Sequence, residues 1–445
     1  MAGKAIKKLV LVGHSGSPSL LSKPLSGEII WGQKIAETLG RLKVECSLLD
    51  LYDFLAKHLS CLKAWQKAEN LNSFLTHENE PLFDDFGRDE LSPLQDDLIQ
   101  ELGSDSALLF FSWDRNLAPF LSLGLQKRVP LISRCTLFHQ EQTPPHVLYE
   151  SSHLILAESP LASQALLKAG IAKEKILLLP PTNGASKPLQ KQESENLKQL
   201  FLDKLGEKFG KKKPFSNCLI GLFSRMVPSK NIDSTLELLD QLWKRTPSFT
   251  VFFRGGFDSS GDGFDFTDFT SKMGKKMEIW NSEPWLVWNG ERADHETVLK
   301  EYAACDLLIS LSGSEGGSLT AAEWIGLGKP VVLLNASTQH SLFSGAACFV
   351  DPEEGFHESG TWFKKPSLED ALKKIEQMVE SEDLRREYSL RASNWAAKFS
   401  EESYLDRIDL MLESASSYYG GEQEKERVKQ LMHIQYDRDM RDFHG

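Results

Sequence analysis

The chain has 445 residues, of which 41% are hydrophobic, so it can bury the cores of two domains of ordinary size. Its formal net charge of −12 argues against broad electrostatic attachment to nucleic acid or anionic lipid, and we expect no nucleic-acid partner. The apolar run near the N-terminus spans only residues 9–12, and no stretch approaches the roughly 18 apolar residues of a membrane span. We expect a soluble, cytoplasmic protein without a transmembrane segment. Peripheral membrane contact through a local basic patch stays open.

Cysteine usage agrees with that compartment. The six cysteines are scattered without CxxC spacing: Cys46, Cys61, Cys135, Cys218, Cys305 and Cys348. Two of them, Cys218 and Cys305, fall at segments expected to be buried strands. The pattern predicts neither disulfides nor a zinc site, and we expect a reducing environment.

The first elements of the chain predict an α/β domain. Residues 6–13 form a short apolar strand that ends in a Gly/Ser loop, and residues 27–39 predict a loop followed by a helix. Gly27 would let backbone N–H groups approach a phosphate closely. An ordinary strand-to-helix turn explains this glycine equally well. Residues 70–105 are rich in acidic side chains and predict a surface helix and loop.

Two cations follow the first apolar strand of the second half. Residues 217–224 are apolar, and Arg225 and Lys230 come directly after them. Because ligands of open α/β sheets bind outside the carboxyl ends of strands, these cations are placed to neutralise a diphosphate. A solvated basic loop is the alternative. Asn231 or Asp233 is expected to begin the following helix, and residues 249–253 predict the next strand.

A second loop places carboxylates around an expected helix start. The apolar strand at residues 305–311 is followed by small residues, and then by a helix that begins near Leu319. The loop residues Gly316, Gly317 and Ser318 would let a ligand approach the backbone, and unpaired N–H groups at the helix start favour an anion.

Two glutamates flank this helix start. Glu315 precedes it, and Glu323 follows eight positions later, so at about 1.5 Å rise per residue the two are separated by roughly 10 Å or a little more. That distance fits the span from a sugar to a ribose across a diphosphate, and a carboxylate suits a vicinal diol. The pattern therefore predicts a nucleotide-sugar site. Taken singly, each glutamate is also explained as an ordinary exposed side chain.

Taken together, residues 218–350 resemble the nucleotide-binding domain of family 4-like, retaining glycosyltransferases of the GT-B fold (glycosyl transferases group 1). The resemblance rests on Arg225 and Lys230, Gly255-Gly256, Trp288-Asn289-Gly290, the step from Tyr302 to Asp306, the Glu315 and Glu323 pair, and Gly328-Lys329-Pro330-Val331-Val332. It implies that Arg225 and Lys230 hold the donor diphosphate, that Glu315 contacts the transferred sugar, and that Glu323 contacts the ribose. This chain departs from the family at Gly317 and Ser318, where an aromatic residue and a glycine are usual.

The resemblance also implies roles in the N-terminal half. His139 falls where family members often place a histidine near the donor sugar, and it is the candidate for an active-site hydrogen bond; His14, His146 and His153 are its rivals. The implied fold is α/β, with two Rossmann-like, doubly wound domains facing across a cleft. We expect an acceptor-binding domain at residues 1–185, a linker at 186–216, a nucleotide-sugar-binding domain at 217–378, and crossing helices with a charged tail at 379–445.

The implied activity is transfer of a hexosyl group from a nucleotide-diphosphate sugar to an acceptor hydroxyl, with retention of anomeric configuration. No cofactor and no metal are expected, because Arg225, Lys230 and residues 316–319 at the helix start would handle the diphosphate charge. The acceptor is open among glycans, lipids, proteins and small metabolites. The alternatives are a non-catalytic nucleotide-sugar-binding protein and a GT-B epimerase or phosphorylase.

Overall fold

A computed structural model describes residues 6–13, 27–50, 106–110, 129–136, 149, 152–181, 190–209, 218–256, 260–261, 264–265, 267–291, 293–336, 338–358 and 361–444. The chain divides into two compact units. The first takes its described residues from Met1–Thr136, Thr143–Leu179 and Tyr404–Asp442. The second takes them chiefly from Pro180–Ser403.

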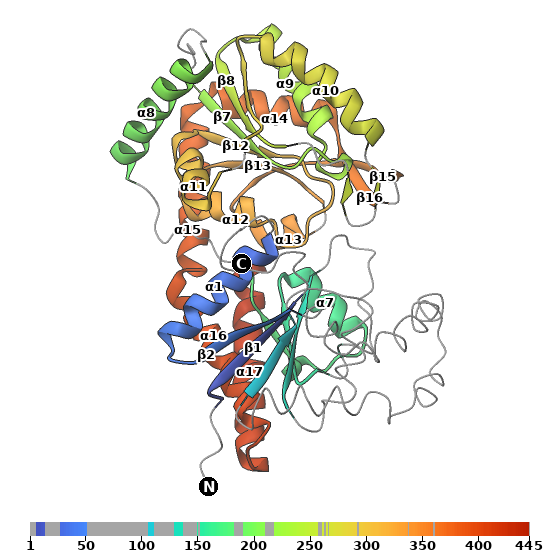
Figure 1. Ribbon diagram of the computed structural model, residues 1–445, viewed down its shortest axis with the longest axis vertical. Coiled ribbons are helices and arrows are strands. Elements are labelled where there is room, and N and C mark those ends of the chain that lie inside the picture. Colours follow the sequence, from blue (N-terminus) through green and yellow to red (C-terminus); the bar gives the residue numbers. More distant parts are fainter. Residues whose placement is uncertain are drawn as a thin grey trace. The chain divides into compact units, whose positions relative to one another are not determined.

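The first unit is built on a six-stranded parallel sheet (Figure 1). Its spatial order is β2-β1-β3-β4-β5-β6. The strands are β1 (Lys8–Gly13), β2 (Glu45–Asp50), β3 (Ser106–Phe110), β4 (Leu131–Cys135), β5 (Leu154–Ala157) and β6 (Ile176–Leu178), with the 3-10 turn η2 (Lys173–Lys175) before the last. Helices α1 (Gly27–Arg41) and α7 (Pro160–Lys168) belong to this unit. The expected first strand and first helix are thus present.

Two C-terminal helices complete the core of the first unit. They are α16 (Glu401–Ser417), of which the part from Tyr404 belongs here, and α17 (Glu422–His444). Buried Ile408, Met411 and Met432 from these helices pack with strand residues such as Leu109 and Ile132. The segment expected as a charged tail is therefore a helix with a buried apolar face.

The second unit contains another six-stranded parallel sheet, in the order β11-β8-β7-β12-β13-β14. Its strands are β7 (Cys218–Phe223), β8 (Phe249–Arg254), β11 (Leu286–Asn289), β12 (Leu307–Ser310), β13 (Val331–Leu334) and β14 (Cys348–Val350). Counted along the chain, this order is 3-2-1-4-5-6, that of the Rossmann fold. The strands are nearly continuous apolar runs, which is typical of parallel strands covered on both faces.

Helices lie around this sheet (Figure 1), and the described part of the unit adds two two-stranded hairpins. The helices are α8 (Lys191–Phe209), α9 (Ile232–Arg245), α10 (Thr267–Ser282), α11 (His295–Ala304), α12 (Leu319–Gly326), α13 (Gln339–Phe343), α14 (Leu368–Glu380) and α15 (Glu382–Lys398), with the 3-10 turn η3 (Pro228–Lys230) before α9. The hairpins pair β9 (Ser260–Gly261) with β10 (Phe264–Asp265), and β15 (Pro352–Glu358) with β16 (Thr361–Pro366).

The segment expected as an interdomain linker contains helix α8. This helix is fastened to the second unit, because Lys198 Nζ lies 2.5 Å from Asp306 Oδ2. One turn earlier on α8, the Ser194 hydroxyl accepts from buried Lys329, which also donates to the carbonyl of Cys305 at 3.0 Å. The family motif at Gly328-Lys329 therefore ties α8 to the sheet. None of the described helices is long and apolar enough to span a membrane.

Candidate functional site

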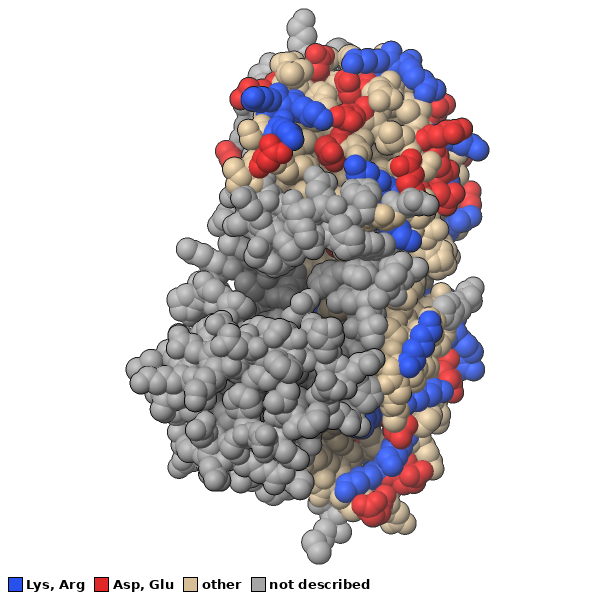
Figure 2. Space-filling model, turned by 90° about the vertical axis from the view of Figure 1, so that its right-hand side faces the viewer, with Lys and Arg blue, Asp and Glu red and all other residues tan. Residues whose placement is uncertain are grey.

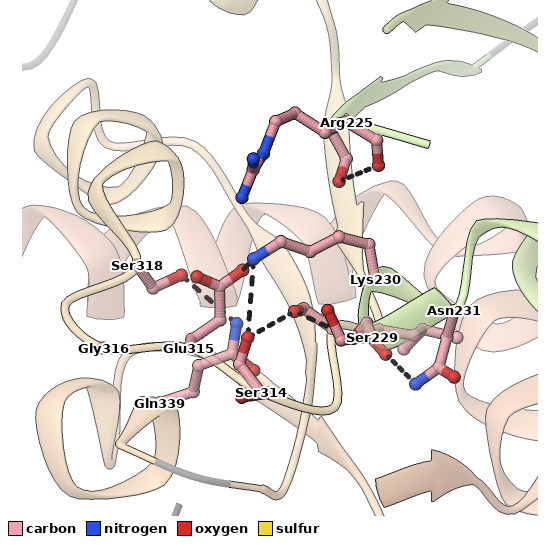
Figure 3. Close-up of polar contacts among 12 residues, drawn as sticks. Arg225, Ser229, Lys230, Asn231, Ser314, Glu315, Gly316, Ser318 and Gln339 are labelled. Carbon is pink, nitrogen blue, oxygen red and sulfur yellow. Dashed lines mark hydrogen bonds and ion pairs between the residues drawn. The ribbon is translucent and has the colours of Figure 1, made fainter. Parts of the chain in front are cut away.

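The candidate site lies at the point where the strand order of the second sheet reverses. Strands β7 and β12 are neighbours there, and their connections leave in opposite directions. Open α/β sheets bind ligands outside the carboxyl ends of the strands at such a switch point. Arg225 and Lys230 follow β7, and Glu315 follows β12, so the sheet brings these three predicted residues together (Figure 3).

The Arg225 segment is positioned by close backbone contact with the end of β8. The N–H of Ser224 donates to the carbonyl of Arg254 at 3.1 Å, and the N–H of Met226 donates to that of Gly256 at 3.0 Å. A Cβ at Gly255 would lie only 2.1 Å from the Ser224 carbonyl oxygen, so this position requires glycine. Arg225 itself is exposed, and its guanidinium extends toward the space beside Lys230 and Glu315 (Figure 3).

Lys230 and Glu315 form an ion pair across the two strand ends. Lys230 Nζ lies 2.6 Å from Glu315 Oε1 and 3.4 Å from the carbonyl oxygen of Ser314 (Figure 3). The two side chains are 16% and 18% exposed. The pair is thus partly desolvated but still open to a ligand, and its cation can neutralise an anion that binds beside it.

Both helices that start at this site are preceded by a residue with left-handed backbone. Asn231 before α9 has φ 51°, and Ser318 before α12 has φ 46°. Within the described structure, neither side chain caps its own helix. The Asn231 amide instead donates to the carbonyls of Leu311 and Lys364, each at 2.8 Å. The first N–H groups of an α-helix have no partner inside the helix, so both starts offer donors to an anion.

The loop between β12 and α12 is fixed from two sides. At Gly313 a Cβ would lie 2.0 Å from the Lys364 carbonyl oxygen of β16, so only glycine allows this contact. At the other end, the Thr338 hydroxyl donates to the carbonyl of Glu315 at 2.8 Å and to that of Gly316. The loop that carries Glu315 is therefore held by elements distant in sequence.

Glu323 lies in the second turn of α12 and is almost fully buried. Its Oε1 is 2.5 Å from Nε2 of His295, the first residue of α11, whose side chain is 31% exposed. Tyr302 on the same helix contacts both Thr320 and Glu323 through its hydroxyl, and burial together with the nearby carboxylate raises the pKa of Tyr302 well above its usual value. The carboxylate is therefore held in one orientation by α11.

The predicted site residues divide into three groups. Those brought together in the second unit are Arg225, Lys230, Glu315, Gly316, Gly317, Ser318 and Leu319, with Glu323 one turn further along α12. Gly27 belongs to the first unit and is the first residue of α1 rather than part of a loop. His139 and its rivals His14 and His146 lie outside the described residues.

His153, the remaining rival, is described, and its contacts are structural. Its Nε2 lies 2.7 Å from the carbonyl oxygen of Ser414, and its ring meets Tyr418 edge-on at 5.4 Å. Burial lowers the pKa of His153. These contacts join it to helix α16 of the same unit.

Sequence reasoning missed several residues that shape the site. His295, Thr338 and Gln339 reach it from segments whose spacing carries no motif. Of these three, only His295 follows a sequence pattern that predicts a helix start. The preceding Asp294 caps α11 by accepting from the N–H of Thr297 at 2.8 Å. Among the described residues, no group of three or more His, Cys, Asp or Glu side chains is arranged to hold a metal ion.

Residues 207–395 match the family described as glycosyl transferases group 1. The second unit is similar to that family. The match confirms the resemblance inferred from the motifs and covers both loops of the candidate site. A curated relative, the poly(ribitol-phosphate) alpha-N-acetylglucosaminyltransferase of Staphylococcus aureus (strain COL), is 25% identical over 190 residues, which are 42% of this chain. The match spans about a third of the length of that relative, 34%.

Solved glycosyltransferase structures share the fold of both units. HepE of Anabaena in complex with UDP and glucose matches with a TM-score of 0.58 and 16% identity, covering 92% of this chain and 100% of that one. The trehalose-6-phosphate synthase OtsA matches with a TM-score of 0.61 and 13% identity, covering 91% and 98%. An alpha,alpha-trehalose-phosphate synthase (UDP-forming) of Burkholderia vietnamiensis has a TM-score of 0.61 and 10% identity, covering 92% and 99%. The expected α/β fold of the GT-B type is thereby confirmed.

Proposed function

We propose that the protein is a glycosyltransferase that moves a hexosyl group from a nucleotide-diphosphate sugar to an acceptor hydroxyl. The observation that carries the proposal is the meeting of Arg225, Lys230 and Glu315 with an uncapped start of α12 at the switch point of a 3-2-1-4-5-6 sheet. The match of residues 207–395 to glycosyl transferases group 1 supports it.

The diphosphate is the group that this charge arrangement suits best. Two cations and the N–H groups at a helix start would surround it, and these donors are fixed before the ligand arrives. Charge that develops on the leaving diphosphate would then be stabilised by Arg225, Lys230 and α12. In this proposal the transfer step needs no metal ion.

The two glutamates would hold the two ends of the donor. Glu315, beside Lys230, would accept hydrogen bonds from hydroxyls of the transferred sugar, and Glu323, oriented by His295, would accept them from the ribose. The acceptor oxygen would bond to the anomeric carbon on the face that the diphosphate leaves. The carbon–oxygen bond to the phosphate breaks, and a phosphate oxygen takes the acceptor's proton. Anomeric configuration is retained in this scheme.

UDP is the first nucleotide to test. HepE was solved with UDP and glucose, and a further neighbour, described as trehalose-6-phosphate from E. coli, was solved with bound UDP-2-fluoro glucose. At 16% and 13% identity these structures show a shared fold only, so the base and the sugar of this chain's donor must be measured.

The experiment is a thermal shift series with UDP, GDP, ADP and their sugar conjugates. A ligand at 100 times its dissociation constant adds about 2.7 kcal/mol of stability. We expect one nucleotide to stabilise the wild type, and Arg225→Ala and Glu323→Ala to weaken that effect. Arg245→Ala is the matched control, because Arg245 pairs with Glu376 at the C-terminal end of α9. A folded protein that no nucleotide stabilises would refute the assigned donor site.

A turnover assay then separates the alternatives. The bound sugar nucleotide is incubated with candidate acceptors, and nucleotide release is followed. Transfer requires that the sugar appears on the acceptor. Release of free nucleotide with an altered sugar and no acceptor would indicate an epimerase, and dependence on inorganic phosphate would indicate a phosphorylase. Binding without turnover for any acceptor would favour the non-catalytic protein.

A further inference from the structure

The residue before helix α12 is a serine that does not cap its helix. Serine in this place normally accepts a hydrogen bond from an N–H of the first turn. Ser318 instead adopts the left-handed conformation, with φ 46° and ψ 57°, and none of the described first-turn N–H groups donates to its side chain. Left-handed backbone is unfavourable for a residue with a Cβ, so something must hold Ser318 there.

Gln339 is the residue that holds the Ser318 hydroxyl. It is the first residue of α13, its side chain is fully buried, and its Nε2 donates to Ser318 Oγ at 3.2 Å (Figure 3). The neighbouring Thr338 hydroxyl fixes the Glu315 and Gly316 carbonyls of the same loop. The start of α13 therefore holds the end of the loop that leads into α12, while β16 holds its beginning at Gly313.

The other end of the Gln339 amide is unsatisfied. Its Oε1 is buried and has no hydrogen-bond partner among the described residues. An unpaired buried acceptor destabilises a fold, and its presence in a native structure calls for an explanation. A leucine would fill the same space without that cost, so the amide contributes something other than stability.

Asn231 shows the same arrangement at the adjacent helix. It has φ 51°, its amide nitrogen is turned to the carbonyls of Leu311 and Lys364, and its Oδ1 also has no partner among the described residues. Positive φ outside glycine occurs in the described chain at Lys43, Asn231 and Ser318, and two of these three begin the helices of the candidate site. Backbone strain of this kind clusters where function requires it.

We propose that Gln339 is a positioning residue that keeps the Ser318 hydroxyl away from the first turn of α12, so that the N–H groups of this turn bind the donor diphosphate. The proposal rests on the proposed function. A glycine at this position would have no hydroxyl to cap the helix. With Gln339 holding its hydroxyl, Ser318 leaves the helix start as open as a glycine would.

The test is a double-mutant cycle on nucleotide binding, measured by calorimetry with the full chain. The probes are the tightest of UDP, GDP and ADP, and the matching nucleoside, which lacks the diphosphate. We expect Gln339→Leu to weaken binding of the diphosphate about tenfold, because the freed hydroxyl caps the helix. Binding of the nucleoside should not change, and the thermal unfolding temperature should not fall.

The rescue comes from Ser318→Gly, which has no hydroxyl to cap the helix and tolerates positive φ. In that background Gln339→Leu should cause no further loss of affinity. The control Gln199→Leu removes an amide that donates to Asp203 at 2.7 Å on the exposed side of α8, and affinity should not change.

Three results would overturn the inference. One is a wild-type affinity of Gln339→Leu for the nucleotide diphosphate. Another is a loss of affinity on adding Gln339→Leu to Ser318→Gly that equals the loss on adding it to the wild type. Equal losses for the diphosphate and the nucleoside would show a general disturbance of the site. A wild type that binds none of the three nucleotides would refute the proposed function as well, and this separates the two failures.

Discussion

Replacing Lys230 by methionine separates the two roles of this residue, pairing with Glu315 and binding the diphosphate. The ammonium lies 2.6 Å from the Glu315 carboxylate, and the side chains are 16% and 18% exposed. A charge-assisted hydrogen bond to a ligand is worth about 1.5–3 kcal/mol, and each 1.4 kcal/mol is tenfold in affinity. We expect Lys230→Met to weaken nucleotide-diphosphate binding by roughly 10- to 150-fold in calorimetric titration.

The same change should also destabilise the fold. It leaves a largely buried carboxylate without its cation. The expected loss in the free energy of unfolding is about 1–3 kcal/mol in urea, between the values for losing a surface ion pair and a buried one. Adding Glu315→Gln should restore most of this stability and none of the affinity. Lys244→Met is the control, since Lys244 pairs with Asp240 on the exposed face of α9. Nucleotide affinity of Lys230→Met within twofold of wild type would contradict the assigned role of Lys230 in binding the diphosphate.

Three further changes test other parts of the structure. His295→Ala should weaken nucleotide binding about tenfold by releasing Glu323, and His295→Gln should recover part of it; unchanged affinity in calorimetry would exclude this role. Gly313→Ala should lower the free energy of unfolding by about 1–3 kcal/mol, because the new Cβ would meet the backbone of β16, and a neutral result would contradict so close an approach of the two backbones. Lowering the pH below about 6.5 should destabilise the protein through His153, because its pKa is lower in the folded protein than in the unfolded chain, which therefore binds the proton first. His153→Asn should flatten the pH dependence of the unfolding temperature between pH 7 and 5. The same pH dependence in the variant and the wild type would count against this role of His153.

Much of the second sheet could be predicted because its strands are short apolar runs that end in polar loops. The run at residues 217–224 contains β7, and the run at 249–253 falls within β8. The strand pattern also predicts that Arg225, Lys230 and Glu315 lie near one another, since parallel strands place their carboxyl ends at one edge of the sheet. The strand order that makes β7 and β12 neighbours completes this prediction.

The remaining features depend on contacts between distant segments, which no local pattern encodes. Gln339 lies 21 positions from Ser318, and His295 lies 28 positions from Glu323. Asn231 precedes α9, as the sequence predicts for a residue at a helix start. Its amide nevertheless donates to the carbonyls of Leu311 and Lys364 instead of capping that helix, which the local sequence does not predict. Polar composition predicts a linker at residues 186–216, and the structure has helix α8 within this range, joined to the second unit through Lys198 and Ser194.

Hydrogen exchange with and without bound nucleotide would locate the binding site, because a nucleotide diphosphate at the starts of α9 and α12 protects the backbone N–H groups there. At a saturating concentration of the tightest nucleotide, we predict slower exchange in peptides covering residues 225–233 and 314–323, with helix α14 unchanged as an internal reference. Protection confined to other segments, while calorimetry shows that the nucleotide is bound, would contradict this account of the site.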